Sequence, residues 1–295
     1  MPTAPHEPYP YDPALTDDAL TDRVRVWQRR RGHRYSVDDV VTGWIACRAR
    51  PASSVNAYVD LGCGIGSVLL MVCDRARPNN AVGIEAQFES FLLAQRNVQR
   101  NRLATRLTVH HGDLRDHALI ERVLQAAPGG YELVTGTPPY KALGAATMSP
   151  DPQRAHARVE LRGGVEAYLQ AAAGVLSANG SFVMCAEMAL DARVTAGAAA
   201  AGLRIARRTD VVPMAGRKAH LFAVYECVGV SSQHGAASDP IVSELVLRHA
   251  DGTRSADAHA MRAFFGLPSN PDELPSPPRG QPPRSEGLHV RRRDG

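Results

Sequence analysis

Short apolar runs alternate with longer amphipathic stretches through the middle of this chain. The runs have the length and β-branched content of buried strands, and the stretches between them place apolar residues at helical spacing. The expected strands are 55–61, 81–85, 107–112, 131–136 and 181–186, and the expected helices are 68–75, 88–102, 119–126, 165–176 and 189–201. Because strands alternate with helices, we expect a parallel sheet that is covered on both faces.

Two further apolar runs, 204–212 and 219–227, are separated by a short Pro/Gly turn with no helix between them. Strands joined in this way pair as an antiparallel hairpin, which we expect at one edge of the sheet. The predicted fold class is therefore α/β, with a mostly parallel seven-stranded sheet, an antiparallel terminal hairpin and helices on both faces.

The two ends of the chain lack this pattern. Residues 1–22 hold five prolines and five acidic residues and no Lys or Arg, which predicts a flexible acidic N-terminal arm. Residues 268–295 hold seven prolines, and such a tail cannot bury enough apolar surface to fold, so we expect it to be disordered. One folded domain is expected over residues 23–267.

The charge of the chain is nearly balanced but unevenly placed. There are 34 Lys+Arg and 30 Asp+Glu, a net charge of +4, which excludes a polycation that coats nucleic acid. Residues 23–34, however, carry six arginines and no acid. Arginine suits phosphates and exposed bases, so this segment leaves a local basic contact open, with a merely solvated face as the alternative.

Composition excludes several other classes of protein. No apolar run approaches the roughly 18 residues needed to cross a bilayer, and no basic and then apolar leader is visible at the N-terminus. The five cysteines form no CxxC pair and indicate reduced thiols, and the histidines lack metal-ligand spacing. We therefore expect a cytoplasmic protein with neither a membrane nor a metal as partner.

A Gly-rich turn follows the first expected strand, in the sequence Asp60-Leu61-Gly62-Cys63-Gly64-Ile65-Gly66. Glycines there let the backbone approach a ligand that lies over the start of the next helix. The turn differs from the dinucleotide pattern G-x-G-x-x-G, because Ser67 stands where the last glycine would be. No Gly-Lys-Ser/Thr follows, so the turn is not a P-loop either.

Acidic residues follow the next two strands. Glu85 ends the second strand, where a carboxylate can accept hydrogen bonds from both ribose hydroxyls, and Asp113 ends the third, where it can accept one from an adenine amino group. Ligands of open α/β sheets bind at these carboxyl ends. Together with the Gly-rich turn, the two acids predict a binding site for S-adenosyl-L-methionine, and the whole arrangement is similar to that of class I methyltransferases with their Rossmann-like sheet.

The tetrapeptide Thr137-Pro138-Pro139-Tyr140 follows the fourth strand. It resembles the Asn/Asp/Ser-Pro-Pro-aromatic motif of enzymes that methylate a planar nitrogen. The resemblance implies that these four residues are catalytic: the first side chain and the first proline's carbonyl accept hydrogen bonds from the target amino group, and the aromatic ring stacks on a flipped base. Threonine departs from the motif, because its hydroxyl is shorter than an asparagine amide and its side chain is β-branched.

Further segments resemble bacterial tRNA(Val) adenine-N6-methyltransferases. They are 31–39 before the first strand, 154–160 after the tetrapeptide, 245–248, which resembles their terminal strand, and 261–265, which resembles their terminal helix. The resemblance implies an N6-adenine methyltransferase acting on tRNA, with residues 31–39 folded over the donor pocket. The residues expected to bind the donor are Tyr35, Asp38, Asp60, Gly62, Gly64, Gly66, Glu85, Asp113 and Leu114. Those expected to bind the substrate RNA are Arg29, Arg30, Arg31, Arg154 and Arg158.

Other functions remain open at this point. The same tetrapeptide occurs in enzymes that methylate a protein glutamine, although those carry a helical substrate domain longer than the 54 residues that precede Val55 here. An rRNA guanine-N2-methyltransferase is a second alternative. The third is a donor-binding adaptor that has lost catalysis through Thr137.

Overall fold

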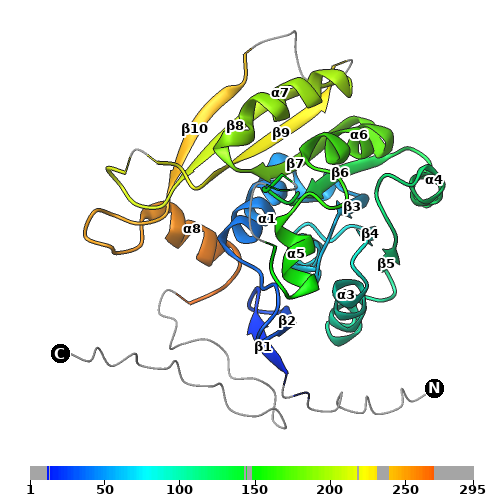
Figure 1. Ribbon diagram of the computed structural model, residues 1–295, viewed down its shortest axis with the longest axis horizontal. Helices are drawn as coiled ribbons and strands as arrows, with labels where there is room; N and C mark the ends of the chain where they lie inside the picture. The colour runs from blue at the N-terminus through cyan, green and yellow to red at the C-terminus, as the bar shows by residue number, and fades with distance from the viewer. Residues whose placement is uncertain are drawn as a thin grey trace.

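The computed structural model describes residues 12, 14–142, 144, 148–217, 219–230 and 239–268. Its centre is an eight-stranded sheet with the strand order β10-β8-β9-β7-β6-β3-β4-β5 (Figure 1). The strands are β3 (Ala57–Leu61), β4 (Asn80–Glu85), β5 (Leu107–His111), β6 (Tyr131–Gly136), β7 (Leu176–Ala186), β8 (Leu203–Val212), β9 (Phe222–Gly229) and β10 (Ile241–Val246).

Eight α-helices are described along with this sheet. They are α1 (Val37–Ala49), α2 (Ser67–Arg75), α3 (Phe88–Arg100), α4 (His117–Gln125), α5 (Pro152–Arg158), α6 (Val165–Val175), α7 (Asp191–Ala200) and α8 (Ala256–Phe264). Short 3₁₀ helices occupy Ala52–Ser54 and Met188–Leu190. All five helices expected between strands are present, and α1 and α5 are additional.

The sheet confirms the predicted fold class. Strands β5, β4, β3, β6 and β7 are parallel neighbours, while β9 runs antiparallel between β7 and β8. The expected hairpin β8–β9 is therefore present, but it does not form the edge of the sheet. An eighth strand, β10, pairs parallel to β8 and covers it. Four of the six β10 residues are exposed, so their pattern carries little of the signal of a buried strand.

Two hydrophobic clusters cover the two faces of the sheet. One contains buried residues of α1, α2 and α3, such as Val41, and the other contains those of α4, α6 and α7, such as Leu169. Side chains alternate along β3, because Tyr58 joins the first cluster and Val59 the second. Helices thus lie on both faces, as predicted.

A β-hairpin precedes α1, where the sequence predicted a loose arm. Strands β1 (Leu15–Ala19) and β2 (Arg25–Arg29) pair antiparallel beside α3 (Figure 1). The prediction of a flexible arm is thus wrong for residues 14–22, because acids of the arm pair with arginines of the following basic segment. The rest of the arm, 1–11 and 13, and the tail from 269 lie outside the described residues.

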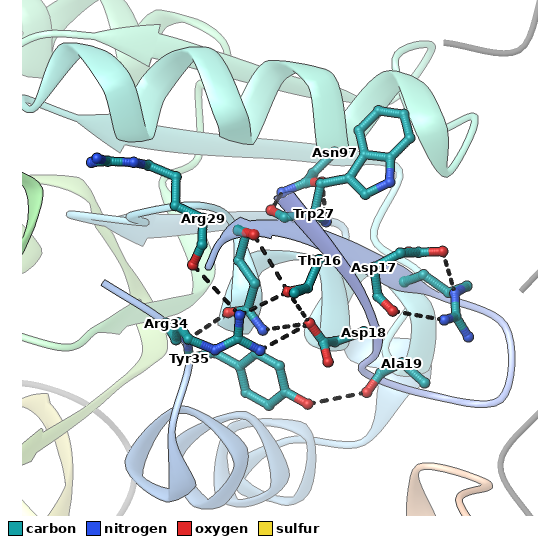
Figure 2. Close-up of polar contacts among 11 residues, drawn as sticks. Thr16, Asp17, Asp18, Ala19, Trp27, Arg29, Arg34, Tyr35 and Asn97 are labelled. Carbon is teal, nitrogen blue, oxygen red and sulfur yellow. Dashed lines mark hydrogen bonds and ion pairs between the residues drawn. The ribbon is translucent and has the colours of Figure 1, made fainter. Parts of the chain in front are cut away.

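Figure 2 shows the polar contacts of this hairpin. Arg34 donates to the Asp18 carboxylate at 3.1 Å and to the Thr16 hydroxyl at 2.7 Å, so it binds one strand of the hairpin to the segment that leads into α1. The backbone N–H of Trp27 donates to the Asn97 side chain of α3 at 2.7 Å. The hairpin is therefore fixed to the domain through side chains as well as through its buried Val26.

Candidate functional site

A pocket opens at the carboxyl ends of β3, β4, β5 and β6, between the segment before α1 and helix α5. These are the strand ends at which open α/β sheets bind ligands. Predicted site residues on its wall are Tyr35, Gly62, Gly64, Glu85, Asp113, Leu114, Thr137 and Pro139. The structure therefore brings the Gly-rich turn, both strand-end acids and the tetrapeptide to one cavity.

The Gly-rich turn lines the pocket through residues 62–65. Gly62, Gly64 and Gly66 have φ angles of 63°, 56° and 89°, in the left-handed region that favours glycine. A Cβ atom on Gly62 would collide with the ring of Tyr168, whereas one on Gly64 would meet nothing within 4 Å. The backbone at Gly64 thus faces open space that a ligand can occupy. Gly66 caps α2 and is not on the wall.

Glu85 is held in place by the backbone of two loops. Its carboxylate accepts hydrogen bonds from the N–H of Gly64 at 2.8 Å and of Gln87 at 2.6 Å. Burial raises the pKa of this carboxyl, while the two N–H donors oppose that rise. The side chain is therefore fixed on the pocket wall at the end of β4.

Asp113 is paired with a cation. Arg115 donates to both of its carboxylate oxygens, at 2.9 and 2.8 Å, and these hydrogen bonds lower the pKa of Asp113. The carboxylate is thus ionised near neutral pH and lies beside Leu114 on the wall. A ligand that uses Asp113 shares it with Arg115.

The acid that faces the pocket from α1 is Asp39, which the sequence analysis did not select. Its carboxylate accepts from the Ser67 hydroxyl at 3.0 Å and from the backbone N–H of Ser36 at 2.9 Å. Burial, followed by the neighbouring Asp38, raises the pKa of Asp39 to about 7. Asp38 itself is absent from the wall. The spacing Ser36-x-x-Asp39 is that of a capping box, and this signal could have singled out Asp39.

Asp60 lies behind the pocket instead of on its wall. It accepts a hydrogen bond from the Thr135 hydroxyl at 2.7 Å, and Thr135 in turn contacts the Tyr58 hydroxyl at 2.7 Å. Burial raises the pKa of Asp60 to about 7. This residue thus supports the strand that carries the Gly-rich turn and does not face the cavity.

The tetrapeptide is divided between the pocket and the core. Thr137 and Pro139 line the pocket, Pro138 is buried, and Tyr140 is half-buried. The Tyr140 hydroxyl donates to the Asp38 carboxylate at 3.1 Å and lies 3.0 Å from the Cys185 sulfur. No described residue hydrogen-bonds the Thr137 hydroxyl, so that group is available to a ligand.

Helix α5 closes one side of the pocket through residues that the sequence analysis did not select. Gln153, which is 1% exposed, accepts from the backbone N–H of His33 at 3.1 Å and donates to the Ser90 hydroxyl at 3.2 Å. Burial lowers the pKa of His33 and of His156, which both line the pocket, and this favours the neutral form of each imidazole. No sequence signal marks Gln153, because its role depends on the packing of three segments.

The predicted RNA-binding arginines differ in their surroundings. Arg29 makes ion pairs of 3.0 Å with both Glu89 and Asp151, so its charge is already matched within the protein. Arg154 is exposed and donates to the carbonyl of Gly32 at 3.0 Å. The remaining three, Arg30, Arg31 and Arg158, are exposed.

The basic segment 23–34 is thus less available to RNA than its composition suggests. Four of its arginines bind acids of the protein: Arg23 with Asp74, Arg25 with Asp17, Arg29 with Glu89 and Asp151, and Arg34 with Asp18. Two of these acids, Asp17 and Asp18, come from the acidic stretch that precedes the segment. The local charge of +6 is therefore largely cancelled by folding.

The pocket fits S-adenosylmethionine by its chemistry. That molecule carries a sulfonium and an ammonium cation and a ribose diol, and the wall offers the carboxylates Asp39, Glu85 and Asp113 together with the open backbone at Gly64. Within the described residues there is no group of three or more metal-ligating side chains. The described helices also include none that is long and apolar enough to cross a membrane.

A mostly parallel sheet with one antiparallel strand, β9, between β7 and β8, and a Gly-rich turn and two acids at the carboxyl ends of its parallel strands, defines a class I methyltransferase. The sequence profile of the methyltransferase small domain family matches residues 48–206, more than half of the chain. The chain therefore belongs to the methyltransferase small domain family.

Two relatives are similar to the chain in sequence, and a solved structure is similar to it in fold. The chain is 28% identical over 171 residues to the tRNA1(Val) (adenine(37)-N6)-methyltransferase of Salmonella arizonae, covering 58% of this chain and 66% of that enzyme. It is 26% identical over 222 residues to the enzyme of the same name from Photorhabdus laumondii, covering 74% and 83%. A predicted O-methyltransferase from Agrobacterium tumefaciens shares the fold, with a TM-score of 0.53, 16% identity and coverage of 78% and 98%.

Proposed function

We propose that this protein transfers a methyl group from S-adenosylmethionine to the N6 amino group of an adenine in tRNA. The observation that carries the proposal is that Thr137 and Pro139 line the same pocket as Gly64, Glu85 and Asp113. A nitrogen-methylating tetrapeptide and a nucleoside site thus share one cavity. The names of the curated relatives support adenine in tRNA as the acceptor, and a tRNA substrate would place the protein in the cytoplasm.

The donor side is assigned to the strand ends β3, β4 and β5. Gly62 and Gly64 let the backbone approach the donor, Glu85 accepts hydrogen bonds from the ribose hydroxyls, and Asp113 with Leu114 holds the adenine end. Asp39, when ionised, attracts the donor's positive charge. When bound, S-adenosylmethionine supplies a methyl group that its sulfonium has already activated.

The acceptor side is assigned to the tetrapeptide. The Thr137 hydroxyl and the Pro138 carbonyl accept hydrogen bonds from the target amino group, which draws the nitrogen lone pair out of conjugation. The two prolines fix the backbone and remove two N–H donors that would compete for these acceptors. Catalysis then rests on orientation and on acceptors that are already in place. The target base has to leave its stack to reach them.

Threonine at position 137 is compatible with this chemistry. Its hydroxyl is on the pocket wall and is not engaged by another described residue. A hydroxyl oxygen has two lone pairs and can accept as a serine does. This favours an active enzyme over a binding protein that has lost catalysis.

The experiment is a transfer assay with labelled S-adenosylmethionine and a panel of acceptors: total tRNA, ribosomal RNA and a release factor with its glutamine. We expect label in tRNA as N6-methyladenosine. The Thr137→Ala variant, which removes only the hydroxyl and its methyl neighbour, should lower the rate on the order of 10–100-fold. Label in N2-methylguanosine or methylglutamine, or no transfer to any acceptor, would overturn the proposal.

A further inference from the structure

Two adjacent acids at the start of α1 face different parts of the site. Asp39 lines the donor pocket and is bound by Ser67 of α2. Asp38 is outside the wall and accepts a hydrogen bond from the hydroxyl of Tyr140, 102 residues away in the chain. One turn of α1 therefore contacts both the donor pocket and the last residue of the tetrapeptide.

Tyr140 is held from its hydroxyl end. The hydroxyl reaches Asp38 at 3.1 Å and the Cys185 sulfur at 3.0 Å, and the side chain packs against the hydrophobic clusters of both sheet faces. A carboxylate is a far stronger acceptor than a thiol sulfur, so the contact with Asp38 fixes the direction of the O–H bond. Burial keeps this hydroxyl protonated by raising the pKa of Tyr140.

Asp38 is itself fixed by the helix start. Its other carboxylate oxygen accepts from the Ser36 hydroxyl and from the backbone N–H of Asp39, the latter at 3.2 Å. Both oxygens are thus used, one by the first turn of α1 and one by Tyr140. Asp38 is therefore held between the helix start and the tetrapeptide, and it is not on the wall of the donor pocket.

We propose that Asp38 is a positioning residue for the acceptor: it orients Tyr140 for stacking on the target base and ties that ring to the helical turn that lines the donor pocket. This inference rests on the proposed function. Because Asp39 belongs to the same turn, donor binding and acceptor binding are coupled through the Asp38–Tyr140 hydrogen bond.

The adjacent acids provide a matched pair of variants. Asp38→Ala should leave the dissociation constant of S-adenosylmethionine within about twofold of wild type and lower kcat with tRNA by tenfold or more, because a misplaced group costs rate and not donor affinity. Asp39→Asn, in contrast, should raise the dissociation constant of S-adenosylmethionine. Asp38→Asn retains an acceptor oxygen and should recover most of the rate.

Tyr140→Phe removes the other half of the hydrogen bond and keeps the ring. It should match Asp38→Ala in kcat, and the double variant should be no slower than either single one, because all three lack the same interaction. The tRNA dissociation constant, measured with and without S-adenosylhomocysteine, gives a second readout. Wild type should bind tRNA more tightly with it, and Asp38→Ala and Tyr140→Phe should lose that difference.

Three results would overturn the inference: weaker donor binding in Asp38→Ala, additive losses in the double variant, or a tRNA affinity in Asp38→Ala that still responds fully to S-adenosylhomocysteine. The donor-binding comparison of Asp38→Ala with Asp39→Asn needs no acceptor. It can therefore refute the role of Asp38 independently of the proposed function, which fails instead if wild type methylates no tRNA.

Discussion

Two buried carboxyl groups near the Gly-rich turn have no cationic partner among the described residues. Asp60 and Asp39 bind hydroxyl and backbone donors, and burial raises the pKa of each to about 7. The folded protein thus keeps protons that the unfolded chain releases near pH 4. The contribution of these two groups to folding stability is fully present below about pH 4 and is lost as the pH rises through about 7.

Asp60→Asn tests this linkage. An amide has no proton to lose, so the variant should lose less stability than wild type between pH 5 and pH 8. The difference in unfolding free energy should be at most roughly 2–3 kcal/mol, from 1.36 kcal/mol per unit of pKa. Urea unfolding at the two pH values measures it. Equal losses in both proteins would show that Asp60 does not titrate in this range.

Donor affinity should also depend on pH through Asp39. The ionised carboxylate attracts a cationic ligand, and the ionised fraction rises steeply around a pKa of about 7. We expect the dissociation constant of S-adenosylmethionine to fall about five- to tenfold between pH 6 and pH 7.5, with a much flatter profile in Asp39→Asn. Calorimetry at several pH values provides the comparison, and parallel profiles in the two proteins would contradict it.

At the residue scale, the sequence was sufficient to place those site residues that lie at the ends of strands. Glu85 and Asp113 follow strands, so their placement at one sheet edge follows from topology alone. Asp38 and Asp39 are neighbours on a helix, where a rotation of about 100° per residue decides which one faces the pocket. The sequence pattern does not contain that rotation: Asp38 was the acid selected from the sequence, whereas Asp39 is the one on the pocket wall.

At the scale of elements, the acidic and basic stretches near the N-terminus are the two strands of one hairpin. Asp17 of β1 accepts from Arg25 of β2 at 3.0 Å and from Arg100 of α3 at 2.6 Å, with all three side chains about seven-eighths buried. This carboxylate therefore joins both strands to the domain.

Asp17→Ala should leave two partly buried guanidinium groups without their partner. We expect a loss of roughly 2–4 kcal/mol in unfolding free energy, within the range for breaking a buried ion pair. Glu121→Ala, at an exposed position on α4, is the matched control and should change stability by less than about 0.5 kcal/mol. Similar melting temperatures for Asp17→Ala and the control would show that the pair contributes nothing.

Neighbouring arginines should have different effects on RNA binding. Arg31 is exposed, whereas Arg29 is bound by Glu89 and Asp151. Arg31→Ala should weaken tRNA binding and reduce the slope of log affinity against log salt by about one unit, while leaving donor binding intact. Arg29→Ala should mainly reduce stability. An unchanged salt slope in Arg31→Ala would remove this residue from the RNA contact.

The hairpin could not be predicted from the net charge of each stretch taken by itself. Each stretch alone indicated a solvated arm or an RNA-binding face, and the contacts that cancel their charges depend on a turn at residues 20–24. Buried Leu20 and Val24 mark that turn in the structure. In sequence they stand among charged residues and give no strand pattern.

At the scale of the whole molecule, the alternation of strands and helices was sufficient to predict the sheet and the edge at which the pocket lies. It missed β10, whose residues Ile241 and Val242 are more than half exposed, although the resemblance of 245–248 to a terminal strand indicated the end of this strand. It also missed the role of α5, because Gln153 connects segments that only the folded chain brings together. The topology was thus predictable, while the closure of the pocket was not.

The central claim is that one pocket combines the donor turn with a tetrapeptide that is active with threonine in its first position. The most direct measurement uses deuteromethyl S-adenosylmethionine, unmodified tRNA and mass spectrometry of the digested nucleosides, for wild type and Thr137→Asn. We predict deuterated N6-methyladenosine from both proteins, with rates within about tenfold, since either side chain offers an acceptor oxygen. Label from the asparagine variant alone, or from neither protein, would contradict the claim.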